Sequence, residues 1–330
     1  MTDHAQHDDA APGGPWTIGL DLGGTKCVGV LLDESACVRE VSQVPTPQRT
    51  EAFVDVLVGV ADDLRGRSPV LVGGIGIGVP GLLSHDGLLR YAPHLPGIVE
   101  FDLLRALTER LAHNVVLEND NTSATWAEFD ARRRTENPRS LLYVGLGTGI
   151  GGALVTDGRL VRGTQGFAGE IGHMVVAMDG PACVCGRRGC WELFASGRAL
   201  ADLMRVADLS IDGRPARDGA DLRVLLDRGS SAAESIANRF ARQVAVGIVN
   251  LVLALDVDHV VIGGGVIGDA AAAGADAPLL SRVRQAIVSE FGDAAEHRAL
   301  PKVSAAAHGP LSGAIGAALL ARPTTHEDRR

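Results

Sequence analysis

Short apolar runs of strand length alternate along the chain with longer segments in which apolar residues recur at helical spacing. The runs that predict strands lie at 16–20, 27–32, 70–79, 115–117, 141–146, 150–155, 258–262 and 302–305. Helical spacing predicts helices over 51–65, 102–113, 122–135, 196–208, 221–228, 231–255, 278–291 and 312–322. Strands that alternate with helices in this way predict an α/β fold.

One local pattern occurs twice. A strand, a Gly-Thr turn and a second strand follow one another near residue 20 and again near residue 147. Two strands joined by a tight glycine turn indicate a β-hairpin, and Asp157-Gly158 predicts a further hairpin turn after the second copy. A duplication of this kind predicts two similar halves that face each other.

The composition fits a globular protein with a sizeable core. Of the 330 residues, 46% are apolar and 22% are charged, and the length favours about two domains. Residues 1–15 contain no apolar stretch, so they are predicted to form a disordered tail and not a signal peptide. The net charge of −9 argues against nucleic acid or an anionic membrane as a partner, and no apolar run has the length of a membrane span. Five cysteines, three of them clustered, do not resemble a disulfide framework and favour the cytoplasm.

Three glycine turns, at 23–25, 147–149 and 263–265, each follow a predicted strand. Backbone N–H groups in such turns can bind the oxygens of a phosphate, although a plain hairpin turn is the alternative for any one of them. Residues 147–152 match the glycine spacing of a dinucleotide-binding motif, but a strand follows here where that motif requires a helix. Residues 24–26 lack the upstream glycine of a P-loop. We therefore expect a nucleotide held between two hairpins.

Asp120 is the candidate general base. It ends the sequence Glu118-Asn119-Asp120, which follows a short strand and precedes a helix. A carboxylate at such a strand end can face a cleft and accept the proton of an acceptor hydroxyl during phosphoryl transfer. The alternative is that Asp120 only caps the helix.

A cluster of one histidine and three cysteines predicts a zinc site. His173, Cys183, Cys185 and Cys190 lie within 18 residues, and an imidazole with three thiolates suits tetrahedral Zn²⁺. Four protein ligands close the site, so the metal would be structural, and free buried thiols are the alternative. Glu170 and Glu192 flank the cluster, which could fix both carboxylates for binding a polyhydroxylated ligand. The alternative for these two is solvent-exposed loop charge.

Together these segments resemble one known family, the ROK sugar kinases (repressor, open reading frame, kinase) of the actin-like ATPase superfamily. The resemblance covers nearly the whole chain after Pro15. Its most specific part is the group of glycine-spaced cysteines downstream of Glu170-Ile171-Gly172-His173. The segments that carry it are 21–26, 118–120, 147–152, 166–173, 183–192, 260–266 and 312–318.

The resemblance implies a two-domain actin-like ATPase (ribonuclease H-like) fold with a cleft between the domains. The small N-terminal domain would comprise residues 16–121, the large domain with its zinc loop residues 122–311, and helix 312–325 would pack back on the small domain. ATP would lie across the cleft, with Asp21 helping to place the Mg²⁺ that accompanies it. The implied ATP-binding residues are Asp21, Gly23, Gly24, Thr25, Lys26, Gly147, Thr148, Gly149, Gly264 and Gly265.

The resemblance also implies a sugar site and assigns Asp120 as the catalytic base. The implied sugar-binding residues are Gly81, Asn119, Asp120, Glu170, His173 and Glu192, and the implied zinc ligands are His173, Cys183, Cys185 and Cys190. The expected activity is an ATP-dependent glucokinase that converts D-glucose to glucose 6-phosphate. Members of the family are often homodimers or homotetramers, so we expect such an assembly.

Three alternatives stay open. The chain has Thr122 where the family commonly has Asn, His94-Leu95-Pro96 where many glucokinases have Asn-Leu-Pro, and Ile98-Val99 where a Trp often follows. These departures allow another acceptor, such as an N-acetylhexosamine or a C7-cyclitol. Some relatives use polyphosphate in place of ATP. A sugar-responsive regulator of the same family would carry a helix-turn-helix domain ahead of the first strand, where only 15 residues stand here.

Overall fold

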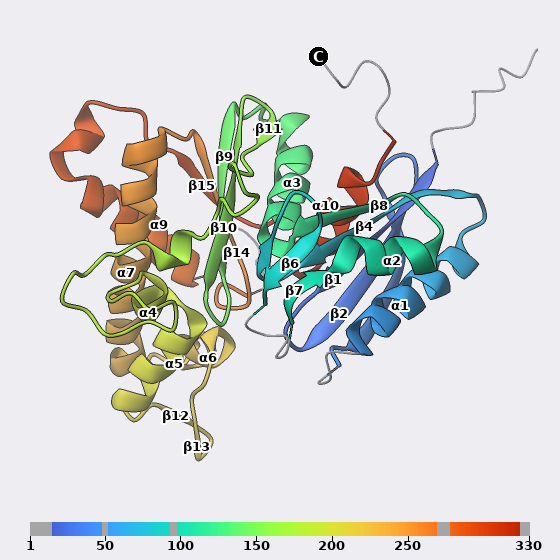
Figure 1. Ribbon diagram of the computed structural model, residues 1–330. Coiled ribbons are helices and arrows are strands. Elements are labelled where there is room, and N and C mark those ends of the chain that lie inside the picture. The colour runs from blue at the N-terminus through green and yellow to red at the C-terminus, as the bar shows by residue number, and fades with distance from the viewer. Residues whose placement is uncertain (1–14, 48–51, 93–97, 269–277, 324–330) are drawn as a thin grey trace, which may run out of the picture.

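Two halves, each built on a five-stranded sheet, make up the protein (Figure 1). The structure, a computed structural model, describes residues 15–47, 52–92, 98–268 and 278–323. The predicted tail of residues 1–15 therefore lies outside the described residues except for Pro15, and so do residues 324–325 of the predicted C-terminal helix.

The first half contains a sheet that is covered by helices on both faces. Its strands are β1 (Trp16–Leu22), β2 (Lys26–Leu32), β3 (Val38–Pro45), β4 (Val72–Val79) and β8 (Val115–Asn119), in the order β3-β2-β1-β4-β8. Along β1, Ile18 and Leu20 are buried in a core shared with α1 (Phe53–Arg67) and α2 (Leu103–Leu111). Gly19, between them, faces α10 (Ser312–Leu320), because successive residues of a strand point to opposite faces. A small sheet of β5 (Leu82–Leu83), β6 (Leu88–Tyr91) and β7 (Val99–Asp102) lies beside this half.

The second half contains the other sheet and most of the helices. Its strands are β9 (Ser140–Leu146), β10 (Ile150–Thr156), β11 (Arg159–Leu160), β14 (His259–Gly263) and β15 (Lys302–Ala305). The helices that share its large core are α4 (Glu192–Ala195), α5 (Gly197–Val206), α6 (Gly219–Asp227), α7 (Ser231–Leu255) and α9 (Pro278–Phe291). The short elements are 3-10 turns η2 (Ile171–His173), η3 (Gly292–Glu296) and η4 (Gly309–Leu311) and the hairpin of β12 (Ser210–Ile211) and β13 (Arg214–Pro215).

The two sheets have the same topology. The second sheet has the order β11-β10-β9-β14-β15, and in both sheets an antiparallel meander of three strands is followed by two parallel strands. The internal duplication that the two strand–turn–strand patterns predict is therefore confirmed.

Helix α3 (Asp120–Arg133) lies between the two sheets (Figure 1). Ala127 packs in a core with α10 and β2 of the first half, whereas Ala124 and Phe129 pack with β9 and β14 of the second. Gly316 of α10 lies so close to α3 that a Cβ there would overlap the carbonyl oxygen of Ser123. Because β8 runs directly into α3, the first residue of this helix is held at the boundary between the halves.

The strand β3 was not predicted from the sequence. Its residues alternate between exposed and half-buried positions, as on an edge strand with one face in solvent, so it lacks an apolar run. The short strands β5, β6, β7, β12 and β13 and the one-turn helix α4 were not predicted either. The predicted elements differ from the observed ones by a few residues at their ends: β4 begins at Val72, α3 begins at Asp120 and α10 ends at Leu320.

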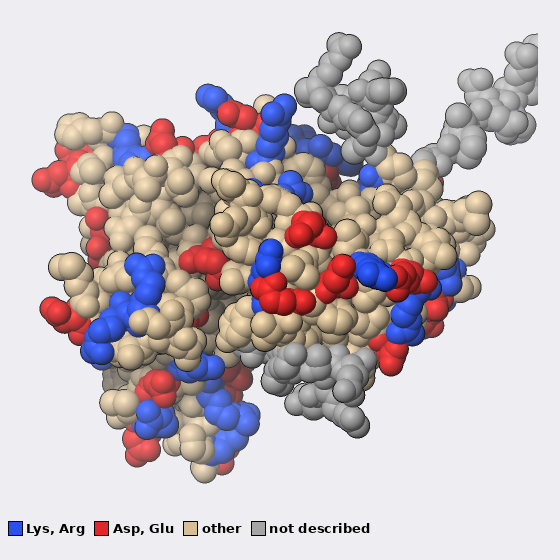
Figure 2. All heavy atoms as spheres, viewed as in Figure 1, with Lys and Arg blue, Asp and Glu red and all other residues tan. Residues whose placement is uncertain are grey.

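By length and composition, helix α7 is long and apolar enough to span a bilayer. The sequence predicted no membrane span, because polar residues interrupt every apolar run before it reaches that length. In this structure 56% of its apolar window is buried inside the protein. Phe240, Val244 and Ile248 lie in the core of the second half, so the composition of α7 is explained by packing. On the face shown in Figure 2, basic and acidic side chains are interspersed.

Candidate functional site

A cavity of about 670 Å³ lies where the two halves meet. Pro80 and Asn119 of the first half line one side, and the turn between β9 and β10 lines the other. Asp120 lies between them at the start of α3. The full lining is Gly24, Pro80, Gly81, Leu82, Tyr91, Asn119, Asp120, Asn121, Tyr143, Gly145, Gly147, Thr148, Gly149, Ile150, Gly151, Glu170, His173, Cys185, Glu192 and Gly264.

Asn119, and not Asp120, caps α3. The Asn119 side-chain oxygen accepts hydrogen bonds from the backbone N–H groups of Asn121 (2.9 Å) and Thr122 (3.2 Å). Its amide nitrogen lies 3.3 Å from the Gly81 carbonyl oxygen, so Asn119 also holds the loop after β4. The cap is therefore supplied by the preceding residue, which leaves the Asp120 carboxylate in the cavity wall.

The carboxylate of Asp120 lies in a place that disfavours its charge. Burial raises the pKa of Asp120 to about 6; the nearby Glu170 carboxylate also raises it, while hydrogen bonds from Asn121 lower it. Burial, and next to it the charge of Asp120, raises the pKa of Asp21 to about 7. A general base for a neutral-pH reaction needs a pKa near the working pH, so the electrostatics of Asp120 suit that role.

The first glycine turn is closed by its own hydrogen bonds. The Gly23 N–H donates to the Lys26 carbonyl oxygen (2.9 Å), so this amide is engaged within the turn. Thr46, which follows the last residue of β3 and was not predicted from the sequence, also holds this turn. Its hydroxyl donates to the Gly23 carbonyl oxygen (2.6 Å), and its N–H donates to the Thr25 carbonyl oxygen (3.0 Å).

The second and third glycine turns lie against each other in the second half. Gly147 N–H donates to the Gly149 carbonyl oxygen (3.0 Å), and Gly197 N–H at the start of α5 donates to the Gly147 carbonyl oxygen (2.8 Å). Gly264 has φ +90° and lies against the backbone of Leu146, where a side chain would collide. These contacts give the cavity a wall of backbone atoms.

The structure brings only part of the predicted ATP-binding set to the cavity. Gly24, Gly147, Thr148, Gly149 and Gly264 line it. The remaining predicted residues do not contribute to the described lining: Asp21, Gly23, Thr25, Lys26 and Gly265. The Lys26 ammonium group lies 3.5 Å from the Gln43 side-chain oxygen on β3. Besides burial, the charge of Asp120 raises the pKa of Asp21, so these two carboxyl groups interact although Asp21 is not part of the lining.

All of the predicted sugar-binding residues line the cavity: Gly81, Asn119, Asp120, Glu170, His173 and Glu192. Gly81 has φ +105° and lies against the Tyr91 carbonyl oxygen, where a Cβ would collide. The Glu192 side chain is 18% exposed, and its Oε1 lies 3.4 Å from Nδ1 of His173. Glu170 is about half exposed, and its Oε2 lies 3.9 Å from Nε2 of the same ring. Both carboxylates therefore belong to the cavity wall and are not free loop charges.

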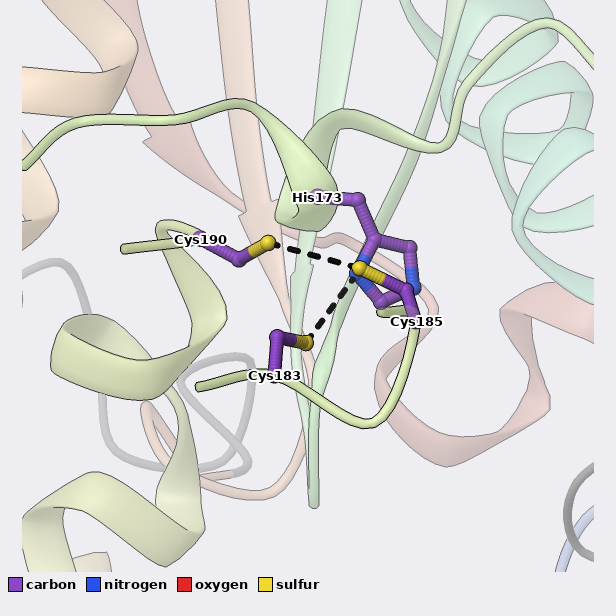
Figure 3. Close-up of side chains that lie close together, drawn as sticks. All are labelled: His173, Cys183, Cys185 and Cys190. Carbon is purple, nitrogen blue, oxygen red and sulfur yellow. Dashed lines mark hydrogen bonds between the residues drawn. The ribbon is translucent and has the colours of Figure 1, made fainter. Parts of the chain in front are cut away.

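The predicted metal ligands converge on one point (Figure 3). His173 comes from η2, and Cys183, Cys185 and Cys190 come from the loop that follows. The ligand atoms all lie within 4.8 Å of one another, with 3.5 Å between the sulfurs of Cys185 and Cys190 and 3.7 Å between Cys183 Sγ and His173 Nδ1. Tetrahedral zinc with Zn–S bonds of about 2.3 Å requires ligand separations of about 3.8 Å. The residues present thus fit Zn²⁺, and all five cysteines are free thiols.

Several residues of the site were not predicted from the sequence. Asn121, Tyr143 and Tyr91 line the cavity, and the only signal for Asn121 was its place next to Asp120. Thr122 is buried, its backbone N–H is bonded to Asn119, and it does not contribute to the described lining. A direct contact of Thr122 with the acceptor is therefore not supported. Residues 94–96 lie outside the described residues.

Known proteins are similar to this chain over nearly its whole length. A model described as "ROK family" matches residues 17–324. An N-acetylmannosamine kinase of Salmonella newport (strain SL254) is 31% identical over 312 residues, 94% of this chain and 99% of the relative. A ROK family glucokinase from Streptomyces griseus in complex with glucose and AMPPNP has a TM-score of 0.78 at 29% identity, covering 93% of this chain and 99% of that chain. A ROK hexokinase from Thermus thermophilus has a TM-score of 0.76 at 34% identity, covering 93% and 97%. These structures confirm the predicted two-domain actin-like ATPase fold.

Proposed function

Because the chain belongs to the ROK family and is an ATP-dependent sugar kinase, we propose that it transfers the γ-phosphoryl group of ATP to the 6-hydroxyl of a hexose, with D-glucose as the first candidate. The observation that carries the proposal is the position of Asp120 in the cavity wall, between backbone turns on one side and sugar-type hydrogen-bonding groups on the other. The solved glucokinase that this chain resembles contains glucose and an ATP analogue, which supports both ligand classes.

In the proposed reaction the glycine turns hold the phosphates and the acidic side chains hold the sugar. Gly24 and Gly147–Gly149 offer a wall without side chains beyond Thr148, where phosphate oxygens can approach. Glu170, Glu192 and Asn119 accept or donate hydrogen bonds to sugar hydroxyls. The Mg²⁺ that accompanies ATP would neutralise charge on the phosphate oxygens, and Asp21 would help to hold it.

Asp120 acts on the acceptor hydroxyl. Its carboxylate accepts the hydroxyl proton as the oxygen attacks the γ-phosphorus; an oxygen–phosphorus bond forms and the bond between the γ-phosphorus and the bridging oxygen breaks. The products are the sugar phosphate and ADP. The carboxylate must be ionised to take the proton, so the reaction requires a pH near or above its pKa of about 6.

Zinc would have a structural role. Its four ligands close the coordination shell, and the loop that they organise carries His173 and Cys185 into the cavity wall. Glu192 lies two residues after Cys190, so zinc would fix the position of that carboxylate as well.

The test of the base is Asp120→Asn. We expect turnover to fall by at least about a thousandfold while sugar binding, measured by calorimetry, changes little. Asp130→Asn on the same helix is the matched control, because Asp130 pairs with Arg133 away from the cavity and should leave turnover unchanged. Turnover by the Asp120→Asn enzyme close to that of the control would remove the proposed base.

The second candidate acceptor is N-acetylmannosamine. It is supported by the curated relative at 31% identity over nearly its full length. Leu82 and Tyr91 in the cavity wall offer an apolar surface that could receive an acetyl methyl group. A kcat/KM panel of glucose, N-acetylmannosamine and a C7-cyclitol, each with ATP and with polyphosphate, decides between these acceptors and donors, because discrimination is expressed in that ratio.

We also propose that residues 16–121 with the C-terminal helix form the small domain and residues 122–311 the large one. The separate hydrophobic cores of the two halves support this division. Crystal structures with and without glucose and AMPPNP should show each part moving as a rigid body, and motion that divides the chain elsewhere would refute it.

A homodimer or homotetramer in the cytoplasm is proposed for the working protein. The assembly is supported by exposed apolar side chains on α7 and α9, namely Leu253, Leu255 and Val288. The compartment is supported by the free cysteines. A monomer in light scattering at micromolar concentration would contradict the assembly, and labelling of the protein outside the cytoplasm in its native cell would contradict the compartment.

A further inference from the structure

The side chain of Asn121 fits a notch formed by two glycines of the second half. Gly145 on β9 and Gly151 on β10 are register partners across the hairpin. A Cβ at Gly151 would overlap the Asn121 side-chain amide, and a Cβ at Gly145 would lie 2.6 Å from Asn121 Oδ1. The amide of Asn121 therefore occupies space that any larger residue at these two positions would fill.

The same amide holds the carboxylate of Asp120. Asn121 Nδ2 donates to Asp120 Oδ1 at 2.9 Å, and the backbone N–H of Asn121 donates to the same oxygen at 2.8 Å. Among the described residues both donors end on Oδ1, which leaves Oδ2 as the oxygen that can accept a proton from an acceptor hydroxyl.

The notch is part of the hairpin that carries the second glycine turn. Gly145 stands two residues before Gly147, and Gly151 two residues after Gly149. A shift of this turn relative to α3 would move the notch, and with it the amide that bonds to Asp120. One side chain thus connects the phosphate-facing turn to the carboxylate.

We propose that Asn121 is a positioning residue for the phosphoryl-transfer reaction. Its amide fits the Gly145–Gly151 notch and thereby holds the Asp120 carboxylate in a fixed position relative to the β9–β10 turn. The inference rests on the proposed function, since it assumes that Asp120 acts as the base. It goes beyond it by naming the group that orients this base and the glycine pair that makes room for that group.

A hydrogen bond to a carboxylate oxygen favours the ionised form, so loss of the Asn121 donor should affect both rate and pH dependence. The other groups that act on Asp120 or feel its charge are Asp21 of β1, Glu170 ahead of η2 and Tyr143 of β9. Asn121→Ala leaves these three side chains themselves unaltered, so we ascribe a shift of the acid limb to the lost donor.

The first experiment is steady-state kinetics of Asn121→Ala. We expect kcat to fall about 10- to 100-fold, the range for loss of one hydrogen bond to a charged group, with KM for sugar and ATP changed less than threefold. The acid limb of the kcat/KM profile should move to higher pH. A kcat within twofold of the parent, or an unmoved acid limb, overturns the inference.

The second experiment uses the notch itself. Gly151→Ala should displace the Asn121 amide and lower kcat, whereas in the double variant Gly151→Ala with Asn121→Ala the new methyl group enters vacated space. We therefore expect the double variant to be no slower than Asn121→Ala alone. Fully multiplicative losses would overturn the notch as the link.

A third measurement needs no catalysis and separates this inference from the proposed function. A double-mutant cycle on unfolding, with Asp120→Asn and Asn121→Ala at pH 8, should show coupling between the two side chains. Absence of kinase activity in the parent with every acceptor would refute the proposed function alone. A coupling of zero would refute the contact, whether or not the parent is active.

Discussion

Arg162 and Glu118 form an ion pair between the two halves, with 2.6 Å between Arg162 Nε and Glu118 Oε2. Glu118 lies on β8, two residues before Asp120, and its other oxygen accepts the backbone N–H of Asn119 at 3.1 Å. Arg162 follows β11 and precedes the loop that carries Glu170 and His173. The pair therefore connects the strand that leads to the proposed base with the loop that leads to the sugar-facing groups.

The ion pair predicts coupled effects on stability and on sugar binding. The Glu118 side chain is only 11% exposed, so loss of Arg162 leaves a poorly solvated carboxylate. In a double-mutant cycle with Arg162→Met and Glu118→Gln, we expect a coupling of about 1–2 kcal/mol in the free energy of unfolding, and a higher KM for sugar in Arg162→Met. The exposed pair Arg105–Glu109 is the control and should show about 0.5 kcal/mol or less. Equal couplings in the two cycles would contradict the prediction.

The raised pKa of Asp120 predicts an acid limb in the rate profile. Burial and Glu170 raise the pKa of this carboxyl from 3.8 to about 6, and only the ionised form accepts a proton. Since protonation increases as the pH falls, log(kcat/KM) should be level above about pH 7 and should fall with a slope near one below pH 6. Measurement of kcat/KM between pH 4.5 and 8.5, with stability checked at each pH, tests this. A rate that stays level down to about pH 4.5 would show that no group with this pKa must be ionised.

The cysteine cluster predicts bound zinc and a matched difference between two exposed cysteines. Cys185 is one of the four converging ligands, whereas Cys37 is exposed and lies outside the cluster. We expect about one zinc per chain by elemental analysis of the purified protein. Cys185→Ser should lose most of it and about 3 kcal/mol or more of unfolding free energy, and Cys37→Ser should lose neither. The same zinc content in both variants would argue against the site.

Local sequence pattern was sufficient for much of the fold and for the cluster of His173 with three cysteines. Strands, helices and the duplicated hairpin follow from hydrophobic period and glycine turns, which act over a few residues. The four predicted zinc ligands also lie within 18 residues, so their spacing in the sequence is enough to indicate a metal site. Asn119 and Asp120 show the limit: both can cap a helix, and only the backbone geometry shows that Asn119 does so.

Contacts between distant segments could not be predicted in this way. Glu128 is fully buried on α3 and accepts hydrogen bonds from Arg132, from the Ala307 and His308 N–H groups, and from the Ser312 hydroxyl. Those partners are up to 184 residues away, and a lone glutamate in a helix gives no sign of them. The notch around Asn121 was not predicted for the same reason, because Asn121 lies on α3 whereas Gly145 and Gly151 lie on β9 and β10.

The close approach of α10 to α3 predicts opposite effects for two glycine-to-alanine changes. A Cβ at Gly316 would overlap the carbonyl oxygen of Ser123, which is backbone and cannot turn away. Gly316→Ala should therefore cost about 2–4 kcal/mol, since α3 and α10 must separate to admit the methyl group. Gly59 lies inside α1, where a Cβ would meet nothing within 4 Å. There alanine should stabilise by about 0.5–1 kcal/mol, because it limits the unfolded chain and favours the helix. Urea unfolding of both variants measures the difference. A Gly316→Ala protein as stable as Gly59→Ala would mean that α10 does not pack against the helix that begins with Asp120, and the position of that residue between the halves would need another explanation.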